Sequence, residues 1–452
     1  MVEEQPQPQA DLKRELTLFD ATMVNVGTIL ASGLFLVPAT IAVQVPASIP
    51  NLAVWLVGGV LALFGAFTMA ELSAAMPNTG GLFVYLQEVY SPLWGFLYGW
   101  ALLLVIQTGT IAALGVAFAS YLGHFWPLDD WSIKLVALAS IVALTALNCR
   151  GVKLGVWTLN ILTLAKIAIV AVVVGWAFRP GTVQAANFLP AWPTEWDFTA
   201  TKLWGLALIA VLWCYDGWVD VTLVAGEVQN PEKNLHRSLV LSMVVIVAIY
   251  LVMNVAYVAV LSVAGMAGRP LVAADFATKA MGAVGAGFVA FLVMISCLGA
   301  NNGFIFTGPR VYYAMAREGL FLRAVGKLHP VYGTPFHSLV LQGLWACVMV
   351  FLLGTYEELF TSVVFVGWVF YGLAAAGVII LRRKRPDWPR PYRCWGYPWV
   401  PVLFVLAAIA LIANTFATDF RSSLIGTLLT ASGVPAYWFW KRRAGSAGTR
   451  RS

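Results

Sequence analysis

Charged side chains are scarce in this chain of 452 residues, because Asp, Glu, Lys and Arg together make up only 11% of it. Soluble domains usually carry about 25%. The four histidines all fall near the ends of apolar segments, so none is placed for catalysis within one. This composition excludes a soluble enzyme, a disordered protein and a nucleic-acid-binding protein. We expect neither enzymatic activity nor a cofactor.

Cysteine is also sparse and is widely scattered. None of the five cysteines forms a CxxC pair or a Cys/His cluster, so we expect no metal site and no disulfide framework. Residues 1–15 lack the basic start and the small-residue cleavage site of a signal peptide. The first apolar segment is therefore expected to stay in the protein as a helix.

Apolar residues, in contrast, make up 60% of the chain and fall into long runs. A membrane-spanning helix needs about 20 mostly apolar residues, and a membrane β-barrel would show short alternating segments instead. We therefore predict an all-α polytopic membrane protein with twelve transmembrane helices. The predicted spans are residues 18–44, 52–76, 92–122, 132–148, 154–178, 203–226, 237–263, 284–314, 337–354, 359–382, 398–416 and 421–440.

The basic residues indicate how these spans are oriented. Most of the 28 Lys and Arg residues fall in the two tails and in alternate loops, with clusters at 382–385 and 441–443. Because cytoplasmic loops carry the excess of Lys and Arg, both termini are predicted to be cytoplasmic, including a tail at 1–15 and a tail at 441–452. The counter-charge expected for these residues is the anionic lipid of the bilayer, not nucleic acid.

Two spans are interrupted in a similar way. Residues 27–33 read GTILASG and residues 213–218 read WCYDGW, in the first and sixth spans. Glycine costs about 1 kcal/mol in a helix interior. Corresponding breaks five helices apart are typical of an inverted repeat whose substrate site lies where the broken helices meet. We predict repeats at about 16–178 and 203–382 in a core of 16–396, followed by two accessory helices in 397–440. Packing glycines in ordinary kinked helices are the alternative.

The first break offers hydrogen-bond donors. Unwound backbone inside a membrane exposes N–H and C=O groups that need partners. The N–H groups of Ala31, Ser32 and Gly33 begin the second half of the span, where the helix dipole favours a carboxylate.

Hydrogen-bond acceptors end the first half of each broken helix. The carbonyls of Ile29, Trp213, Cys214 and Asp216 suit an ammonium group. Donors and acceptors side by side predict a site for a zwitterion, in particular an α-amino acid.

Lys166 lies well inside the fifth span. A lysine within a membrane is costly and normally needs a partner or a watery cavity. We interpret it as a fixed cation that holds the broken helix, in place of a metal ion or as a proton-linked group. Snorkelling to the interface is the alternative, and the distance of Lys166 from both ends of the span disfavours it.

Asp216 has two interpretations that the sequence leaves open. It could contact a substrate cation or take up a proton, or it could cap the half-helix expected to begin at Trp218. Trp213 and Trp218 flank the break and could cover a ligand. Gln107 and Asn302 are polar groups in the middle of their spans that could line the cavity or could simply hydrogen-bond between helices.

Several motifs resemble a known family. The segment 27–35, GTILASGLF, resembles the G-S/T-x-I-G-S-G-I-F signature of the amino acid–polyamine–organocation superfamily. Residues 215–218, YDGW, with 226–234, GEVQNPEKN, and 382–392, RRKRPDWPRPY, resemble its L-type amino acid transporter branch. The similarity runs from about residue 15 to 440.

This resemblance implies a LeuT-type fold, with a 5+5 inverted repeat and alternating access. It implies that the backbone at Ser32 and Gly33 binds the substrate carboxylate, while carbonyls at Ile29, Trp213 and Asp216 bind its amino group. Trp213 matches the aromatic gate position of the family. Lys166 matches a lysine that stands where sodium-coupled relatives bind an ion, which implies sodium-independent transport.

Two departures from the family pattern qualify the resemblance. Ala31 replaces the middle glycine of the signature, so the carboxylate pocket is expected to be smaller or shifted. The outer loop 123–131 lacks the cysteine that links animal L-type transporters to a heavy subunit. A free-standing, bacterial-type protein without a disulfide-linked partner is expected.

The function predicted from the sequence is a sodium-independent amino acid transporter of the cell membrane, either an exchanger or a proton-linked symporter. Neutral L-amino acids are favoured and cationic ones are the alternative substrates. A polyamine or amine permease of the same superfamily is the alternative function, and it would need no carboxylate site.

Overall fold

The computed structural model describes residues 12–269, 271–352 and 356–448, and leaves undescribed the side chains of residue 352 and of 356–362 and 444–448. Residues 1–11 of the predicted N-terminal tail and 449–452 of the predicted C-terminal tail lie outside this description. The described chain is helical, and its single isolated β-bridge pairs Leu16 with Val228.

The first half of the chain, up to the fifth predicted span, forms helices that follow the apolar runs. They are α1 (Leu18–Ile29), α2 (Gly33–Gln44), α3 (Ser48–Ala75), α4 (Leu82–Val89), α5 (Pro92–Ala101), η1 (Leu102–Ile106), α6 (Gln107–Leu122), α7 (Asp130–Cys149) and α8 (Val152–Ala177).

The helices of the second half of the chain have more interruptions. Its elements are η2 (Ala185–Phe188), α9 (Phe198–Cys214), α10 (Asp220–Leu223), η3 (Ala225–Glu227), α11 (Pro231–Leu261), α12 (Val263–Met266), α13 (Val272–Met281), α14 (Gly285–Thr307), α15 (Pro309–Arg317), α16 (Phe336–Leu352), α17 (Tyr356–Lys384), α18 (Trp399–Thr418), α19 (Phe420–Ala431) and α20 (Gly433–Gly448).

The helices are long enough for a polytopic membrane protein. Among the described residues, eight helical segments are apolar and long enough to cross a membrane, and the bent pair α1 and α2 makes a ninth. Two shorter apolar helices, α9 and α16, coincide with further predicted spans. The expected all-α membrane fold is therefore confirmed, as a LeuT-type helix bundle.

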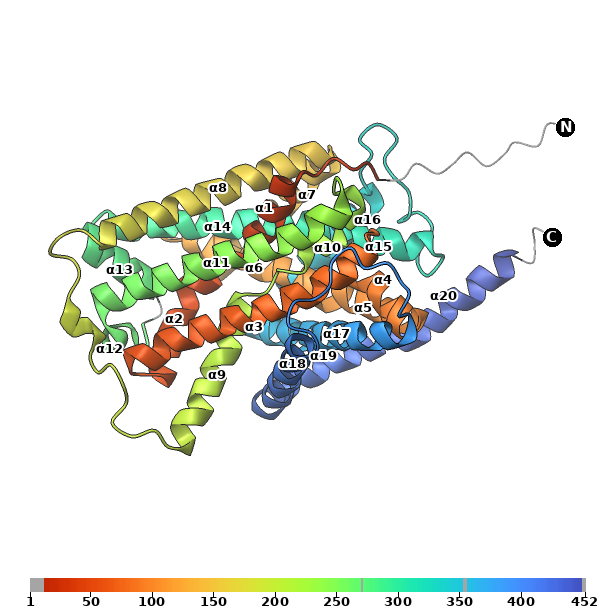
Figure 1. Cartoon of the computed structure of the whole chain (residues 1–452). Helices are drawn as coiled ribbons and strands as arrows, with labels where there is room; N and C mark the ends of the chain where they lie inside the picture. The colour runs from red at the N-terminus through yellow and green to blue at the C-terminus, as the bar shows by residue number, and fades with distance from the viewer. Residues whose placement is uncertain (1–11, 270, 353–355, 449–452) are drawn as a thin grey trace.

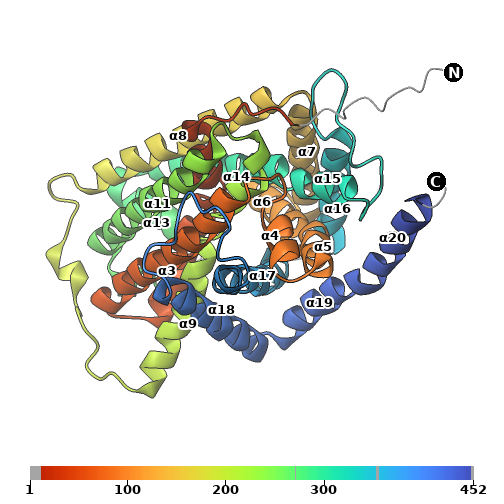
Figure 2. The ribbon, with the colours of Figure 1, turned by 45° about the vertical axis from the view of Figure 1, so that its right-hand side comes forward.

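The broken helix α1–α2 lies at the centre of the bundle. α1 packs against α8, α11 and α14, and α2 packs against α9. The long helices α3, α8, α11 and α14 run alongside one another, whereas α18, α19 and α20 follow one edge of the bundle (Figures 1 and 2). The described start of the chain and the end of α20 lie at the same end of the molecule, on the right in Figure 1.

Two predicted spans differ in detail. The span predicted at 421–440 is divided at Ser432 into α19 and α20, and α20 continues through the expected tail as far as Gly448. Pro435 explains the division, because it has no N–H to donate back to the preceding turn. In the sixth span, the part after the break holds only the single turn α10 and the 3₁₀ turn η3.

Candidate substrate site

The first broken helix bends by 44° between α1 and α2. Leu30, Ala31 and Ser32 form the break, and the Ala31 N–H donates to the Ile29 carbonyl over 2.7 Å. This donor was expected to be open, but the turn satisfies it locally. Gly33 begins α2, and its N–H has no acceptor among the described residues. The open donor of the break is therefore displaced toward the start of α2, where the helix dipole is positive.

Lys166 reaches this break from α8. Its side chain is fully buried, and its Nζ donates to the carbonyls of Gly27 over 2.7 Å and of Leu30 over 3.0 Å. A Cβ on Gly299 of α14 would lie 2.5 Å from Lys166 Cε, so the glycine leaves room for the lysine. The ammonium group therefore binds carbonyl groups on both sides of the last turn of α1.

In the second broken helix, α9 ends at Cys214. Tyr215, Asp216 and Gly217 follow, and Gly217 has a φ of +103°, which glycine adopts at little cost. The Thr28 hydroxyl of α1 lies 3.1 Å from the Gly217 carbonyl and shares its single hydrogen between this carbonyl and two carbonyls of its own helix. The two breaks are therefore in direct contact.

Tyr250 of α11 joins the two breaks. Its fully buried hydroxyl lies 2.8 Å from the Ile29 carbonyl and 2.9 Å from the Cys214 carbonyl, and its single hydrogen is shared between them. The sequence analysis did not single out this residue. The available signal was a phenol in the middle of a long apolar run, which needs a buried hydrogen-bond partner.

Three of the four carbonyls expected to be open already have partners. Ile29 accepts from Tyr250 and Ala31, and the Trp213 carbonyl accepts from the Asp216 N–H over 2.9 Å. Carbonyl oxygens have two lone pairs, so the Cys214 carbonyl, which accepts only from Tyr250 among the described residues, retains capacity for an ammonium group. The Asp216 carbonyl has no donor among the described residues.

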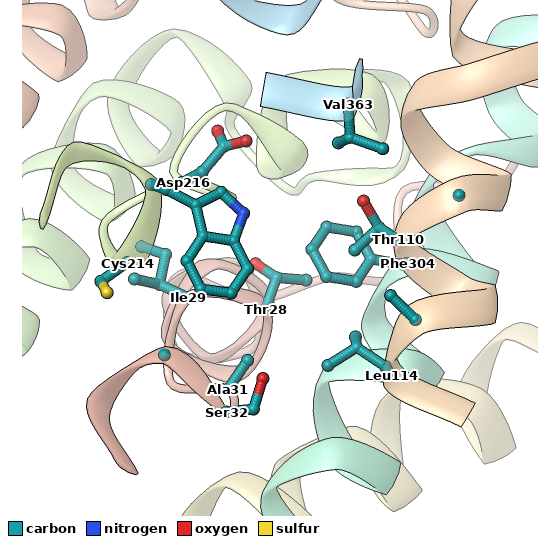
Figure 3. A pocket seen from close by; sticks show the side chains of 14 residues that line it. Thr28, Ile29, Ala31, Ser32, Thr110, Leu114, Cys214, Asp216, Phe304 and Val363 are labelled. Atoms are coloured by element: carbon teal, nitrogen blue, oxygen red, sulfur yellow. The ribbon is translucent and has the colours of Figure 1, made fainter. Parts of the chain in front are cut away.

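A cavity lies where the two breaks meet. Figure 3 shows Thr28, Ile29, Ala31 and Ser32 of the first break facing residues of α6 and α14 across it. The cavity is narrow, because the volume open to the centre of a water-sized sphere is about 50 Å³. The lining residues are Thr28, Ile29, Ala31, Ser32, Gly33, Gly109, Thr110, Ala113, Leu114, Trp213, Cys214, Asp216, Phe304 and Val363.

All seven residues predicted to bind substrate line this cavity, but three predicted as possible lining residues do not. Trp218 is fully buried against Tyr371 and Phe404. Gln107 donates to the Phe304 carbonyl over 2.9 Å, an interhelical contact.

Asn302, the third of these, is also occupied in helix packing. It donates to the Gly155 carbonyl and accepts from Asn148 over 2.7 Å, so it ties α14 to α7 and α8. Buried polar side chains in membranes are satisfied by neighbouring helices, which explains both amides.

Sequence reasoning also missed much of the wall opposite the breaks. Thr110 and Leu114 of α6 and Phe304 of α14 line it, together with Val363 of α17. They sit in apolar runs that carry no local signal, since only the packing of α6 and α14 beside α1 brings them to the cavity.

Asp216 lies at the edge of the cavity and is half-buried. One carboxylate oxygen accepts from the adjacent Gly217 N–H over 2.9 Å. The expected helix cap at Trp218 is not formed, because α10 begins only at Asp220. Among the described residues, no cationic side chain pairs with Asp216.

The end of the bundle that holds the two termini is closed by buried ion pairs. Arg310 of α15 makes a bidentate pair with Glu227 of η3, at 2.6 Å and 3.0 Å, and both side chains are buried. Nearby, Leu16 and Val228 form the isolated β-bridge. These contacts tie η3 to α15 and to the start of the described chain.

A second buried carboxylate joins further elements. Glu71 of α3 accepts from Arg382 over 2.6 Å and from the Cys394 N–H over 2.7 Å, and Arg390 lies 3.4 Å away. It therefore fastens α17 and the following loop to α3.

Membrane-length helices, of which two are broken at a shared central cavity, define a secondary transporter. The model of the amino acid permease family matches residues 16–435. The chain therefore belongs to the amino acid permease family, within the amino acid–polyamine–organocation superfamily.

Curated relatives are amino acid exchangers and transporters by name. The serine/threonine exchanger SteT of Bacillus subtilis (strain 168) is 30% identical over 96% of this chain and 98% of its own. The human cystine/glutamate transporter is 31% identical over 96% of this chain and 86% of its own. The human large neutral amino acids transporter small subunit 2 is 29% identical over 96% and 82%. These relatives are transporters rather than enzymes.

Proposed function

We propose that this protein transports amino acids across the cell membrane by alternating access, independently of sodium. The observation that carries the proposal is the central cavity, which brings the open N–H of Gly33 within one site with the acceptor carbonyls at the end of α9. A helix start suits a carboxylate, and carbonyls suit an ammonium group. An α-amino acid presents both groups a single carbon apart.

Neutral L-amino acids are the favoured substrates of this proposal. The wall facing the breaks is mainly apolar, from Ala113 and Leu114 to Phe304 and Val363. The Asp216 carboxylate already accepts a hydrogen bond from the Gly217 N–H. Cationic substrates stay the alternative, since Asp216 borders the cavity without a cationic partner among the described residues.

Lys166 supports sodium independence in this proposal. Its ammonium group fills the space beside the first break and binds the carbonyls that a sodium ion would need. We further propose that both termini are cytoplasmic, as the basic loops indicate, and that the protein acts without a disulfide-linked heavy subunit. The cycle is exchange or proton-linked symport, and the exchanger among the relatives favours exchange.

Uptake into proteoliposomes tests the proposal. The purified protein should take up labelled serine, alanine or leucine, faster when the vesicles are preloaded with unlabelled amino acid, and equally well when choline replaces sodium. Isoamylamine, which is leucine without its carboxylate, should not compete. Competition by isoamylamine and putrescine but not by leucine would instead establish an amine permease, and a steep dependence on a sodium gradient would exclude the role given to Lys166.

A further inference from the structure

A second, separate groove lies between α7 and α16, at the end of the bundle that holds the termini. The two helices lie side by side (Figure 2). The volume of the groove is about 430 Å³, and its walls are mainly apolar, with Val142 and Ala146 on α7 and Leu344 on α16. Val142 is 57% exposed and Leu344 is 64% exposed, so in a membrane both face the lipid.

The rim of the groove is cationic and aromatic. Arg150, which follows α7, is exposed and makes no ion pair within the described part of the chain. His329 stacks on Tyr332 at 4.7 Å between ring centroids. Its Nδ1 accepts from the backbone N–H groups of Val331 and Tyr332, so the neutral ring carries its proton on Nε2 and offers a donor there.

An unsatisfied polar group lies deeper in the groove. Thr145 is 8% exposed, and its hydroxyl has no hydrogen-bond partner among the described residues. It stands five residues before Arg150, about 7 Å along the helix axis. The oxygen lies below the surface of the groove, against Gly343 of α16, so the hydroxyl is packed between the two helices.

We propose that this groove binds an anionic phospholipid of the cytoplasmic leaflet. The phosphate lies against Arg150 and His329, and one acyl chain follows Val142, Ala146 and Leu344. Three features favour this occupant. The groove opens to the bilayer, its only charged lining residue is a cation, and the cytoplasmic leaflet is negatively charged. The leaflet follows from the orientation proposed above.

Native mass spectrometry of the purified protein tests the site. Protein in detergent is titrated with phosphatidylglycerol or with phosphatidylcholine of the same chains. Phosphatidylglycerol should be retained preferentially, at one molecule per chain. Arg150→Gln should weaken retention about fivefold, the contribution of one basic residue at a membrane surface. Leu344→Trp, which fills the groove, should weaken retention of both lipids.

Matched variants control for charge and for bulk. Arg383→Gln removes an exposed arginine on α17, and Val244→Trp adds the same bulk on the exposed face of α11, which is 53% exposed at that residue. Both should retain lipid as the parent does. The proposal is overturned if Arg150→Gln and Arg383→Gln act equally, if phosphatidylcholine binds as well, or if glycerol 3-phosphate alone competes.

Photo-crosslinking of the unmodified protein keeps the test decisive if a variant does not fold. Phosphatidylglycerol with a photoreactive acyl chain should label peptides from 142–150 and 336–347, and labelling confined to other helices would contradict the site. Neither experiment measures transport, so its failure is distinguishable from failure of the proposed function.

Discussion

Gly33 serves two physical needs at one position. Its N–H begins α2 at the cavity, and its missing side chain lets α9 approach the break. A Cβ placed there would lie 2.8 Å from Cys214 Sγ and 3.1 Å from the Trp213 ring. Loss of function in a Gly33 variant could therefore arise from lost substrate binding or from helix packing, and a second substitution separates the two.

We expect Gly33→Val to abolish uptake while the protein still elutes as a folded species in detergent. The double variant Gly33→Ala with Cys214→Ala removes the sulfur that the new Cβ would meet. If the Gly33 backbone binds the carboxylate, the half-saturating concentration in this variant should still rise about tenfold or more, because the new Cβ keeps the carboxylate from approaching the N–H and weakens a charge-assisted hydrogen bond. Recovery to the behaviour of Cys214→Ala alone would show that only packing matters at Gly33.

Substitution of Asp216 tests whether the site prefers neutral or cationic substrates. Asp216→Asn should leave competition by alanine and leucine within about twofold, because the amide keeps an acceptor for the Gly217 N–H that holds the carboxylate. Competition assays with labelled serine measure this. If arginine and lysine alone no longer compete in the variant, Asp216 binds the cationic group of the substrate.

Among the elements, the first broken helix depends most on groups outside its own sequence. Its last turn is held by Lys166 from α8, its end by Tyr250 from α11, and its contact with the second break by the Thr28 hydroxyl. The glycines at 27 and 217 permit the breaks, but these side chains determine where the backbone turns.

Lys166→Met should lower the transport rate by about tenfold or more, because the carbonyls of Gly27 and Leu30 lose a charged donor. Gly299→Ala should have a similar effect while keeping the lysine, since its Cβ would displace Lys166 Cε.

Gly175→Ala is the control for Lys166, because it lies on the same helix α8 with no neighbour within 4 Å of its new Cβ. Initial rates in proteoliposomes measure all three variants. An unchanged transport rate in Lys166→Met would show that the lysine neither holds the break nor takes part in coupling.

At the scale of the whole molecule, the structure is closed at the end that holds the termini. The Glu227–Arg310 pair is the most deeply buried ion pair among the described residues, with exposed fractions of 0% and 1%. Opening a path to that end requires this pair to separate or to move as a unit. The strength of this ion pair therefore sets how readily the protein leaves the closed state.

Arg310→Met should lower the stability of the closed state by about 3–5 kcal/mol, because it leaves the Glu227 carboxylate buried without a partner. Thermal denaturation in detergent measures the change. The double variant with Glu227→Gln should recover part of the loss, since it removes the unpaired charge. Lys153→Gln, which removes an exposed pair with Glu15 at 3.8 Å, should change stability by about 1 kcal/mol or less. If the effects of Arg310→Met and Glu227→Gln on stability simply add, the two side chains are not coupled.

The sequence by itself determined the class of fold and the location of the breaks. Apolar runs as long as those of α3, α8 and α11 allow only membrane helices, and glycines beside short polar stretches mark where two helices unwind. These are local properties, so they can be seen along the chain. The family motifs around 27–35 and 215–218 added the position of the cavity.

Only the tertiary structure decided which groups of the breaks are open and which residues face them. Hydrogen bonds from Tyr250 and from the turn at Ala31 satisfy backbone groups that appear free in the sequence. Gln107 and Asn302 pack between helices, while Phe304, without any local signal, lines the cavity. Each outcome depends on contacts between residues far apart in the chain, and hydropathy, which is summed along the chain, carries no information about such contacts.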